Sequence, residues 1–339
     1  MHLRHVAVAA LAVFTGACEF EVSSVEQALV ACPNWACAQN NPTLNNRNFH
    51  ELAEDGTANA EGFQLGPMVK DGVSYRVRVV GTRLTGYSRL NTISGAALVG
   101  AYFYVVDQGQ HVLRVNINGI AAVPVWAGPK KGELLESYRL EWSDPVADRI
   151  QNLCSTPPLE KPQGSELLGQ KGDYTLVFEN ARYDAKAKTV LPGDRNWFNI
   201  GCAGHALSKL LLTGHHPLTG SAKVIEQQAT LKMLVADYCG DGTPFTVGGE
   251  PLYWTSSNGY MPFFANPETL EARWNEHGAV CIGQPRLKTT KSTIAQQTFP
   301  SIDAAIDEQC AATRPPSCDD IDVNNFDSAL VVSGNPINE

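Results

Sequence analysis

The sequence predicts an α+β fold, with an antiparallel strand-rich N-terminal part followed by a disulfide-bearing mixed α/β part. Three observations support this prediction. Apolar and polar residues alternate in several short runs of the first half, which is the period of a half-buried strand. Apolar residues recur at helical spacing in several runs of the second half. Six of the nine cysteines lie between positions 151 and 320.

The first 17 residues have the features of a signal peptide. A basic residue, Arg4, precedes an apolar run over 6–14, and small residues precede Cys18. The run is too short for a membrane-spanning helix, which needs about 20 apolar residues. Small residues directly before a cysteine resemble the lipobox that directs lipid attachment to the thiol, so we expect Cys18 to be a lipid anchor. Thr15 stands where the lipobox prefers leucine, and simple cleavage without lipid attachment remains the alternative.

The other cysteines are expected to form disulfides. The chain has nine cysteines, and eight remain once Cys18 is assigned to the lipid anchor. An exported chain meets an oxidising compartment, where an even number of cysteines favours disulfide bonds. Spacing alone leaves their pairing open, although Cys32 and Cys37 can close a small loop around Pro33 and Asn34. The disulfide candidates are Cys32, Cys37, Cys154, Cys202, Cys239, Cys281, Cys310 and Cys318.

A flexible stalk or linker is expected over 18–62, which is polar and rich in asparagine and has no sustained apolar period. The strand-rich region is expected over 63–150. Residues 73–79 alternate between apolar and polar, and further alternating or apolar runs lie at 98–106, 113–117 and 138–142. Short strands separated by Gly and Asn turns indicate an antiparallel sandwich or barrel.

A mixed region is expected over 151–320, and a C-terminal tail over 321–339. The stretch 154–171 is rich in Pro and Gly and is expected to be a loop or a domain boundary. A strand over 174–178 is expected to turn back near Asp184. Helical spacing and capping residues then predict helices over 202–213, 221–238, 266–274 and 301–311, and an apolar run predicts a buried strand over 279–283.

Charge and hydropathy exclude some partners. The formal net charge is -9 and there is no basic run, which argues against nucleic acid as a partner because phosphate neutralisation needs clustered Lys and Arg. No segment after the leader is long and apolar enough to span a membrane, so membrane contact is expected only through the lipid anchor. The sequence indicates no cofactor and no metal site, and it leaves other partners and the oligomeric state open.

Three separated motifs resemble the ADYC domain of secreted proteins and lipoproteins, which is named for the tetrapeptide Ala236 to Cys239. The motifs occupy residues 197–209, 234–242 and 278–283. The resemblance implies export and a lipid anchor and supplies no catalytic mechanism. This chain has Leu210 and Thr230 where family members carry two further cysteines, which is what a lost disulfide would look like. The resemblance then implies that Cys202, Cys239 and Cys281 pair among themselves or with Cys154, Cys310 or Cys318.

The leading function is that of a noncatalytic exported cell-envelope protein, a lipoprotein or a secreted protein with a disulfide-stabilised binding or structural domain whose ligand is unknown. No catalytic residue is assigned. The alternative is a cysteine hydrolase or peptidase that uses Cys202 and His277, because a thiol at a helix N-terminus has a lowered pKa. Asn199 or Asp237 would orient the histidine.

Two metal sites are also conceivable in the motif region. Cys202, His205 and Cys239 could contribute to a zinc site, although no second pair at ligand spacing completes it. Residues 237–242 resemble the start of a calcium loop, but Gly248 stands where the glutamate of such a loop is needed. Bonded cysteines and a glycine-containing turn are the simpler interpretations.

Overall fold

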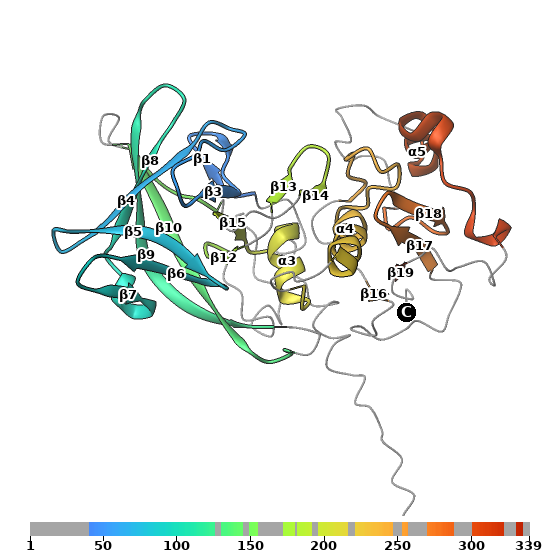
Figure 1. Cartoon of the computed structure of the whole chain (residues 1–339). Helices are drawn as coiled ribbons and strands as arrows, with labels where there is room; N and C mark the ends of the chain where they lie inside the picture. The colour runs from blue at the N-terminus through green and yellow to red at the C-terminus, as the bar shows by residue number, and fades with distance from the viewer. Residues whose placement is uncertain are drawn as a thin grey trace, which may run out of the picture.

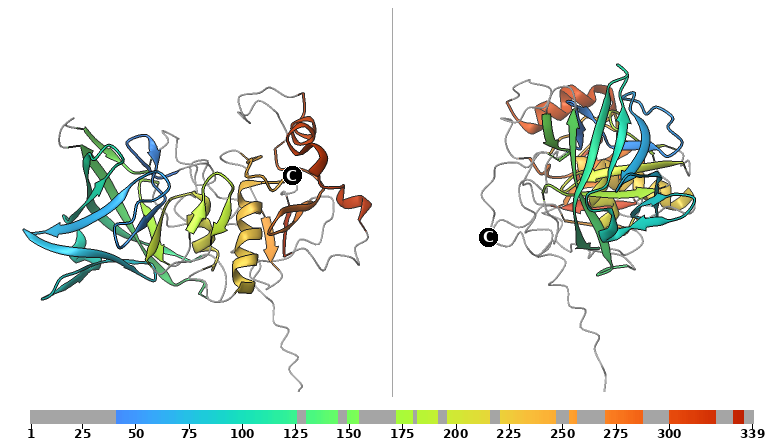
Figure 2. Two further views of the ribbon diagram at one scale, coloured as in Figure 1. Left: turned by 45° about the horizontal axis from the view of Figure 1, so that its top comes forward. Right: turned by 90° about the vertical axis from the view of Figure 1, so that its left-hand side faces the viewer.

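The structure is a computed structural model, and it describes residues 41–125, 130–144, 149–154, 172–179, 182–191, 196–215, 221–246, 253–256, 270–287, 300–321 and 330–334. A curved sheet occupies one end of the molecule, a smaller sheet with a helix occupies the other, and two helices lie between them (Figure 1, Figure 2). The predicted signal peptide, Cys18, Cys32 and Cys37 lie outside the described residues. Within those residues, no helix has both the length and the apolar composition needed to cross a membrane.

The curved sheet has eleven antiparallel strands in the order β3-β15-β12-β10-β9-β8-β4-β5-β6-β7, with β11 paired to β10. The first two strands in this order are far apart in the sequence, since β3 pairs with β15. The strands are β3 (Glu51–Ala53), β4 (Gln64–Lys70), β5 (Val73–Val80), β6 (Arg83–Tyr87), β7 (Thr92–Ser94), β8 (Tyr102–Val106), β9 (Val112–Pro124), β10 (Leu134–Asp144), β11 (Arg149–Asn152), β12 (Thr175–Glu179) and β15 (Trp197–Cys202). A 3-10 turn, η1 (Gly95–Leu98), connects β7 to β8.

Alternation along the strands places apolar side chains on the inner face of this sheet. In β5, Tyr75, Val77 and Val79 are buried while their neighbours are exposed, as the sequence predicts. The sheet curls until β5 and β6 reach β12, where the Glu179 amide donates to the Gly81 carbonyl at 3.0 Å. We call this unit the barrel-like sheet.

The stalk expected over 18–62 is not what the structure shows for its described part, from residue 41 on. Residues 43–53 form β1 (Thr43–Leu44), β2 (Arg47–Asn48) and β3, and the side chains of Leu44, Phe49 and Leu52 are fully buried. Their backbone partners are distant in sequence, because the Ile200 amide donates to the His50 carbonyl at 2.7 Å. A segment ordered by such long-range contacts has no local period that marks it.

The expected division at 150/151 also differs from the structure, because β12 and β15 belong to the barrel-like sheet. The hairpin β9–β10 contributes to two cores. Tyr138 and Leu140 pack inside the barrel-like sheet, whereas Val123, Val125 and Leu135 pack against the helices of the second part.

The remaining elements form what we call the helix–sheet region. Helix α4 packs against α3 on one side and against a four-stranded antiparallel sheet, in the order β16-β19-β17-β18, on the other (Figure 1). A short hairpin, β13–β14, also contacts α4 through β14. The elements are α3 (Ala206–Leu212), α4 (Ser221–Val235), α5 (Ile302–Cys310), β13 (Arg182–Asp184), β14 (Thr189–Leu191), β16 (Tyr253–Ser256), β17 (Leu270–Asn275), β18 (Gly278–Ile282), β19 (Val331–Gly334) and the 3-10 turns η4 (Ala311–Thr313) and η5 (Cys318–Asp320).

Three predicted helices are confirmed and one is wrong. Helices α3, α4 and α5 correspond to the predictions over 202–213, 221–238 and 301–311. The Ser301 hydroxyl caps α5 by accepting from the Ala304 amide. The helix predicted over 266–274 is wrong for its described residues, because β17 begins at Leu270 and pairs with β18 and β19.

Candidate functional site

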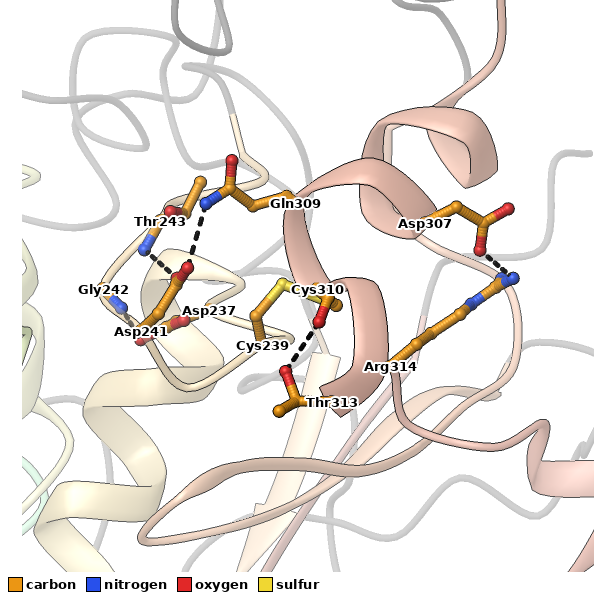
Figure 3. Close-up of a disulfide and its surroundings, with 10 residues drawn as sticks. All are labelled: Asp237, Cys239, Asp241, Gly242, Thr243, Asp307, Gln309, Cys310, Thr313 and Arg314. Carbon is orange, nitrogen blue, oxygen red and sulfur yellow. Dashed lines mark hydrogen bonds and ion pairs between the residues drawn. A yellow bond between two sulfur atoms is a disulfide. The ribbon is translucent and has the colours of Figure 1, made fainter.

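Three disulfides connect described residues: Cys154–Cys202, Cys239–Cys310 and Cys281–Cys318. Their Cα separations are 5.6, 5.0 and 4.9 Å, within the usual range for a disulfide. The first joins the end of β15 to the segment after β11. The second joins the turn after α4 to α5 (Figure 3). The third joins β18 to η5.

The cysteine hydrolase alternative is wrong for this structure. Cys202 is fully buried and bonded to Cys154, so it has no thiol to ionise. It is the last residue of β15 rather than the first of a helix. The side chain of His277 is 84% exposed and lies 3.6 Å from Glu276. Bonded sulfurs likewise leave neither Cys202 nor Cys239 available for zinc, and the described residues contain no group of three or more potential metal ligands.

The first half of the ADYC tetrapeptide ends helix α4. Ala236 has φ +52°, and its amide donates to the Met233 carbonyl, as in a left-handed helix end. The Asp237 side chain is fully buried. One of its oxygens accepts from the Lys232 ammonium at 2.5 Å and from the Gly242 amide at 2.8 Å. Through this oxygen Asp237 holds the turn, in agreement with the simpler of the two interpretations of residues 237–242.

The second half of the tetrapeptide joins that turn to the four-stranded sheet. The Tyr238 hydroxyl donates to Glu271 at 2.7 Å, and its ring stacks on Trp274 with centroids 5.3 Å apart. Glu271 is paired with Arg286 at 2.6 Å, and both side chains are buried. Burial raises the pKa of Tyr238 well above its usual value, which keeps the hydroxyl protonated as a donor.

Cys239 completes the tetrapeptide through its bond to Cys310. The loop beside this disulfide is held by the Asp241 carboxylate, which accepts from the Thr243 amide and the Gln309 side chain (Figure 3). Each residue of the tetrapeptide thus has a structural task, and none of the four lines the cavity described next.

A cavity of about 240 Å³ lies where the N-terminal segment, the β13–β14 hairpin, the start of α3 and the end of α4 meet. Its position is at the junction of the two cores. Such junctions are common places for small-molecule sites. The lining residues are Asn41, Asn48, His50, Tyr183, Asp184, Ala185, Lys188, Gly204, His205, Ala206, Leu207, Lys209, Leu231, Leu234, Val235, Pro244 and Thr246.

Four basic side chains line this cavity: His50, Lys188, His205 and Lys209. Burial lowers the pKa of His205 to about 3, and the neighbouring basic groups add repulsion. Burial lowers the pKa of Lys209 to about 7, with a further contribution from the charge of Arg286. The pKa of Lys188 is also lowered, again mainly by burial. At neutral pH the cavity therefore contains a neutral imidazole and an amine poised near its midpoint of protonation.

Three buried polar atoms of this lining have no hydrogen-bond partner among the described residues: Asn48 Oδ1, His50 Nδ1 and His205 Nδ1. His50 is only 5% exposed, and its Nε2 lies 2.8 Å from the Tyr183 carbonyl oxygen. A carbonyl can only accept, so Nε2 carries a proton, and in the neutral form of the ring Nδ1 is then an acceptor. An unsatisfied buried polar atom costs about 1–3 kcal/mol, and a ligand that supplies partners offsets that cost.

Sequence reasoning found only part of this site. His205 drew attention through its spacing from Cys202, but the structure places it at a cavity rather than at a metal. His50 was missed because its segment resembled a linker. His205 and Lys209 are four residues apart at the start of α3, a spacing that brings side chains to one helix face and could have linked them.

A family model described as the ADYC domain matches residues 95–288, which is more than half of the chain. The match includes β8 to β12, β15, both central helices and the hairpin β17–β18. No curated protein and no solved structure matches the chain.

Proposed function

This chain belongs to the ADYC domain family, and on that premise we propose that it is an exported, noncatalytic binding protein that holds a small molecule in the cavity beside His50 and His205. The observation that carries this proposal is that three buried polar atoms without a hydrogen-bond partner among the described residues lie in the lining of one cavity, while other such atoms, for example Thr230 Oγ1 and Gln227 Oε1, lie elsewhere. In folded proteins such atoms are rare, and a bound ligand is one of the ways in which they are satisfied.

Export and the cell-envelope or secreted location rest on different observations. The leader over 1–17 and the cysteine at position 18 support secretion followed by lipid attachment. The three disulfides support an oxidising compartment, where such bonds persist. The disulfides stabilise the domain, and none of their cysteines lines the cavity.

Ligand-observed NMR with a set of small acids, amines and neutral fragments tests binding in the cavity. We expect some fragments to bind the mature protein and to lose binding in Ala206→Trp, because Ala206 lines the cavity at the start of α3. Leu90→Trp is the matched control, since Leu90 is 98% exposed on the barrel-like sheet. Absence of any binder, or equal binding to wild type and Ala206→Trp, would contradict the proposal.

The lipid anchor has its own test. We expect the protein to fractionate with membranes and to show an intact mass increased by a diacylglyceryl group at Cys18. Cys18→Ala should move it to the soluble fraction. An unmodified N-terminus in the membrane fraction would rule the anchor out, while leaving the binding proposal to the NMR experiment.

A further inference from the structure

We infer that the ligand of this cavity is a small hydroxy acid, whose carboxylate lies against the basic side chains and whose hydroxyl group donates to Nδ1 of His50. The inference rests on the proposed binding function and specifies its ligand class. It is carried by the charge of the lining, by the hydrogen-bond state of His50 and by the apolar wall of the cavity.

The charges of the lining favour an anion. Lys188 and Lys209 are the side chains of the lining that can carry a positive charge near neutral pH, since the pKa of His205 is lowered to about 3, and Asp184 is acidic. One oxygen of Asp184 accepts from the amides of Lys186 and Ala187 at 2.8 Å each, so this carboxylate is engaged in holding the hairpin turn. A carboxylate entering the cavity would pair with a protonated lysine and form charge-assisted hydrogen bonds with it.

His50 adds a requirement that a simple anion does not meet. Its ring is fixed by the contact between Nε2 and the Tyr183 carbonyl, and its backbone carbonyl accepts from the Ile200 amide. In the neutral form of the ring the remaining nitrogen accepts, and it needs a donor from the ligand. A carboxylate has no donor, whereas a hydroxyl group has one. Asn48 Oδ1 offers a second acceptor for another hydroxyl.

The size and the apolar part of the lining fit a short carbon chain. Leu207, Leu231 and Leu234 contribute apolar surface. A volume of about 240 Å³ corresponds to the space of about eight water molecules at ~30 Å³ each. A hydroxy acid with four to six carbons is of this scale.

Three probes with related skeletons separate these requirements. D-gluconate has a carboxylate and hydroxyl groups, sorbitol has only the hydroxyl groups, and hexanoate has only the carboxylate. Calorimetric titration of the mature protein should show gluconate binding at least tenfold more tightly than either of the other two. Binding of sorbitol or hexanoate with the same affinity as gluconate would overturn the inference.

Two substitutions assign the contacts. Lys209→Met should weaken gluconate at least tenfold and leave sorbitol unchanged, whereas His50→Phe should weaken gluconate and leave hexanoate unchanged. Lys186→Met is the matched control for charge, because Lys186 is exposed on the same hairpin and does not line the cavity. If Lys209→Met leaves gluconate binding unaltered, the charge assignment is wrong.

A measurement on the unsubstituted protein covers the case in which a variant fails to fold. In protein labelled with ¹⁵N-histidine, gluconate should shift the Nδ1 resonance of His50 upfield, because a nitrogen acceptor responds to a new hydrogen bond. No shift at saturating gluconate overturns the inference. Should none of the three probes bind while other fragments are lost in Ala206→Trp, the hydroxy acid is wrong and the binding function stands. Should no fragment bind at all, both are wrong.

Discussion

The barrel-like sheet and the helix–sheet region are stabilised in different ways. The barrel-like sheet has long strands, up to thirteen residues in β9, and one continuous apolar core that includes Trp142 and Tyr138. In the helix–sheet region the strands have three to six residues, and two disulfides and two buried ion pairs supplement the core. The difference teaches that a region of short strands depends more on specific bonds, whereas the large sheet, which has the disulfide Cys154–Cys202, relies mainly on apolar burial.

Removing a disulfide from the helix–sheet region should have the largest effect. Cys239→Ala combined with Cys310→Ala opens a loop of 71 residues, and the free energy of unfolding should fall by about 4 kcal/mol. Hydrogen exchange should rise mainly in α4, α5 and β17. Equal loss of protection in β5 and β9 would break the comparison, because it would mean that both regions depend on this bond.

Breaking the buried ion pair of Glu271 and Arg286 should have the next largest effect. Glu271→Gln leaves the buried guanidinium without a charged partner and should destabilise by about 3 kcal/mol. Arg83→Met is the matched control, because the pair of Arg83 with Glu136 on the barrel-like sheet is mostly exposed, and its loss should cost less than about 1 kcal/mol. Chemical denaturation of both variants measures the difference, and similar losses would contradict it.

The pH dependence of the free energy of unfolding should reveal the lowered pKa of Lys209. Its pKa is about 7 when folded and 10.5 ordinarily, so between these values the unfolded chain binds a proton that the folded chain does not. Stability should therefore rise as pH increases from 7 to 10.5, and Lys209→Met should flatten this rise. The full pKa difference is an upper limit because Lys209 is partly exposed, and we expect about 2 kcal/mol in denaturation curves. A rise unchanged in the variant would show that Lys209 is not responsible.

His205 should produce a smaller effect at acid pH. Its folded pKa of about 3 lies below the ordinary 6.5, so the unfolded chain takes up the proton first and stability falls as pH decreases from 6.5 toward 3. His205→Gln should lose about 1 kcal/mol less than wild type between pH 7 and pH 4.5, after allowance for partial exposure. Thermal melts in a non-binding buffer compare the two proteins; parallel curves would argue against a buried neutral imidazole.

How much could be predicted from the sequence differs between elements. Strand β5 was predictable because its alternation is local and continuous. Strand β17 was misread since Asn266 and Pro267 look like a helix start, whereas the burial of Ala272 and Trp274 on alternate positions is decided by partners β18 and β19. The tetrapeptide could be recognised from the sequence, but the role of Ala236 in ending helix α4 could not, because its positive φ is visible only in the coordinates.

The cavity was harder to predict than any element. Four chain segments meet there, and His50 joins it only because β3 pairs with β15, almost 150 positions later in the chain. The disulfide partners were equally hidden, since the eight candidate cysteines allow about 105 pairings. Long-range pairing, rather than local propensity, determines both.

The long hairpin β9–β10 has a consequence for how this protein can be divided. The hairpin contributes side chains to both apolar cores: Tyr138 lies in the core of the barrel-like sheet, and Val123 and Leu135 lie in the core of the helix–sheet region. Division of the chain after position 150 would expose Val123 and Leu135 to solvent in the N-terminal fragment. It would also remove β12 and β15 from the barrel-like sheet. The two regions should therefore be expressed, mutated and transferred together, as one folding unit.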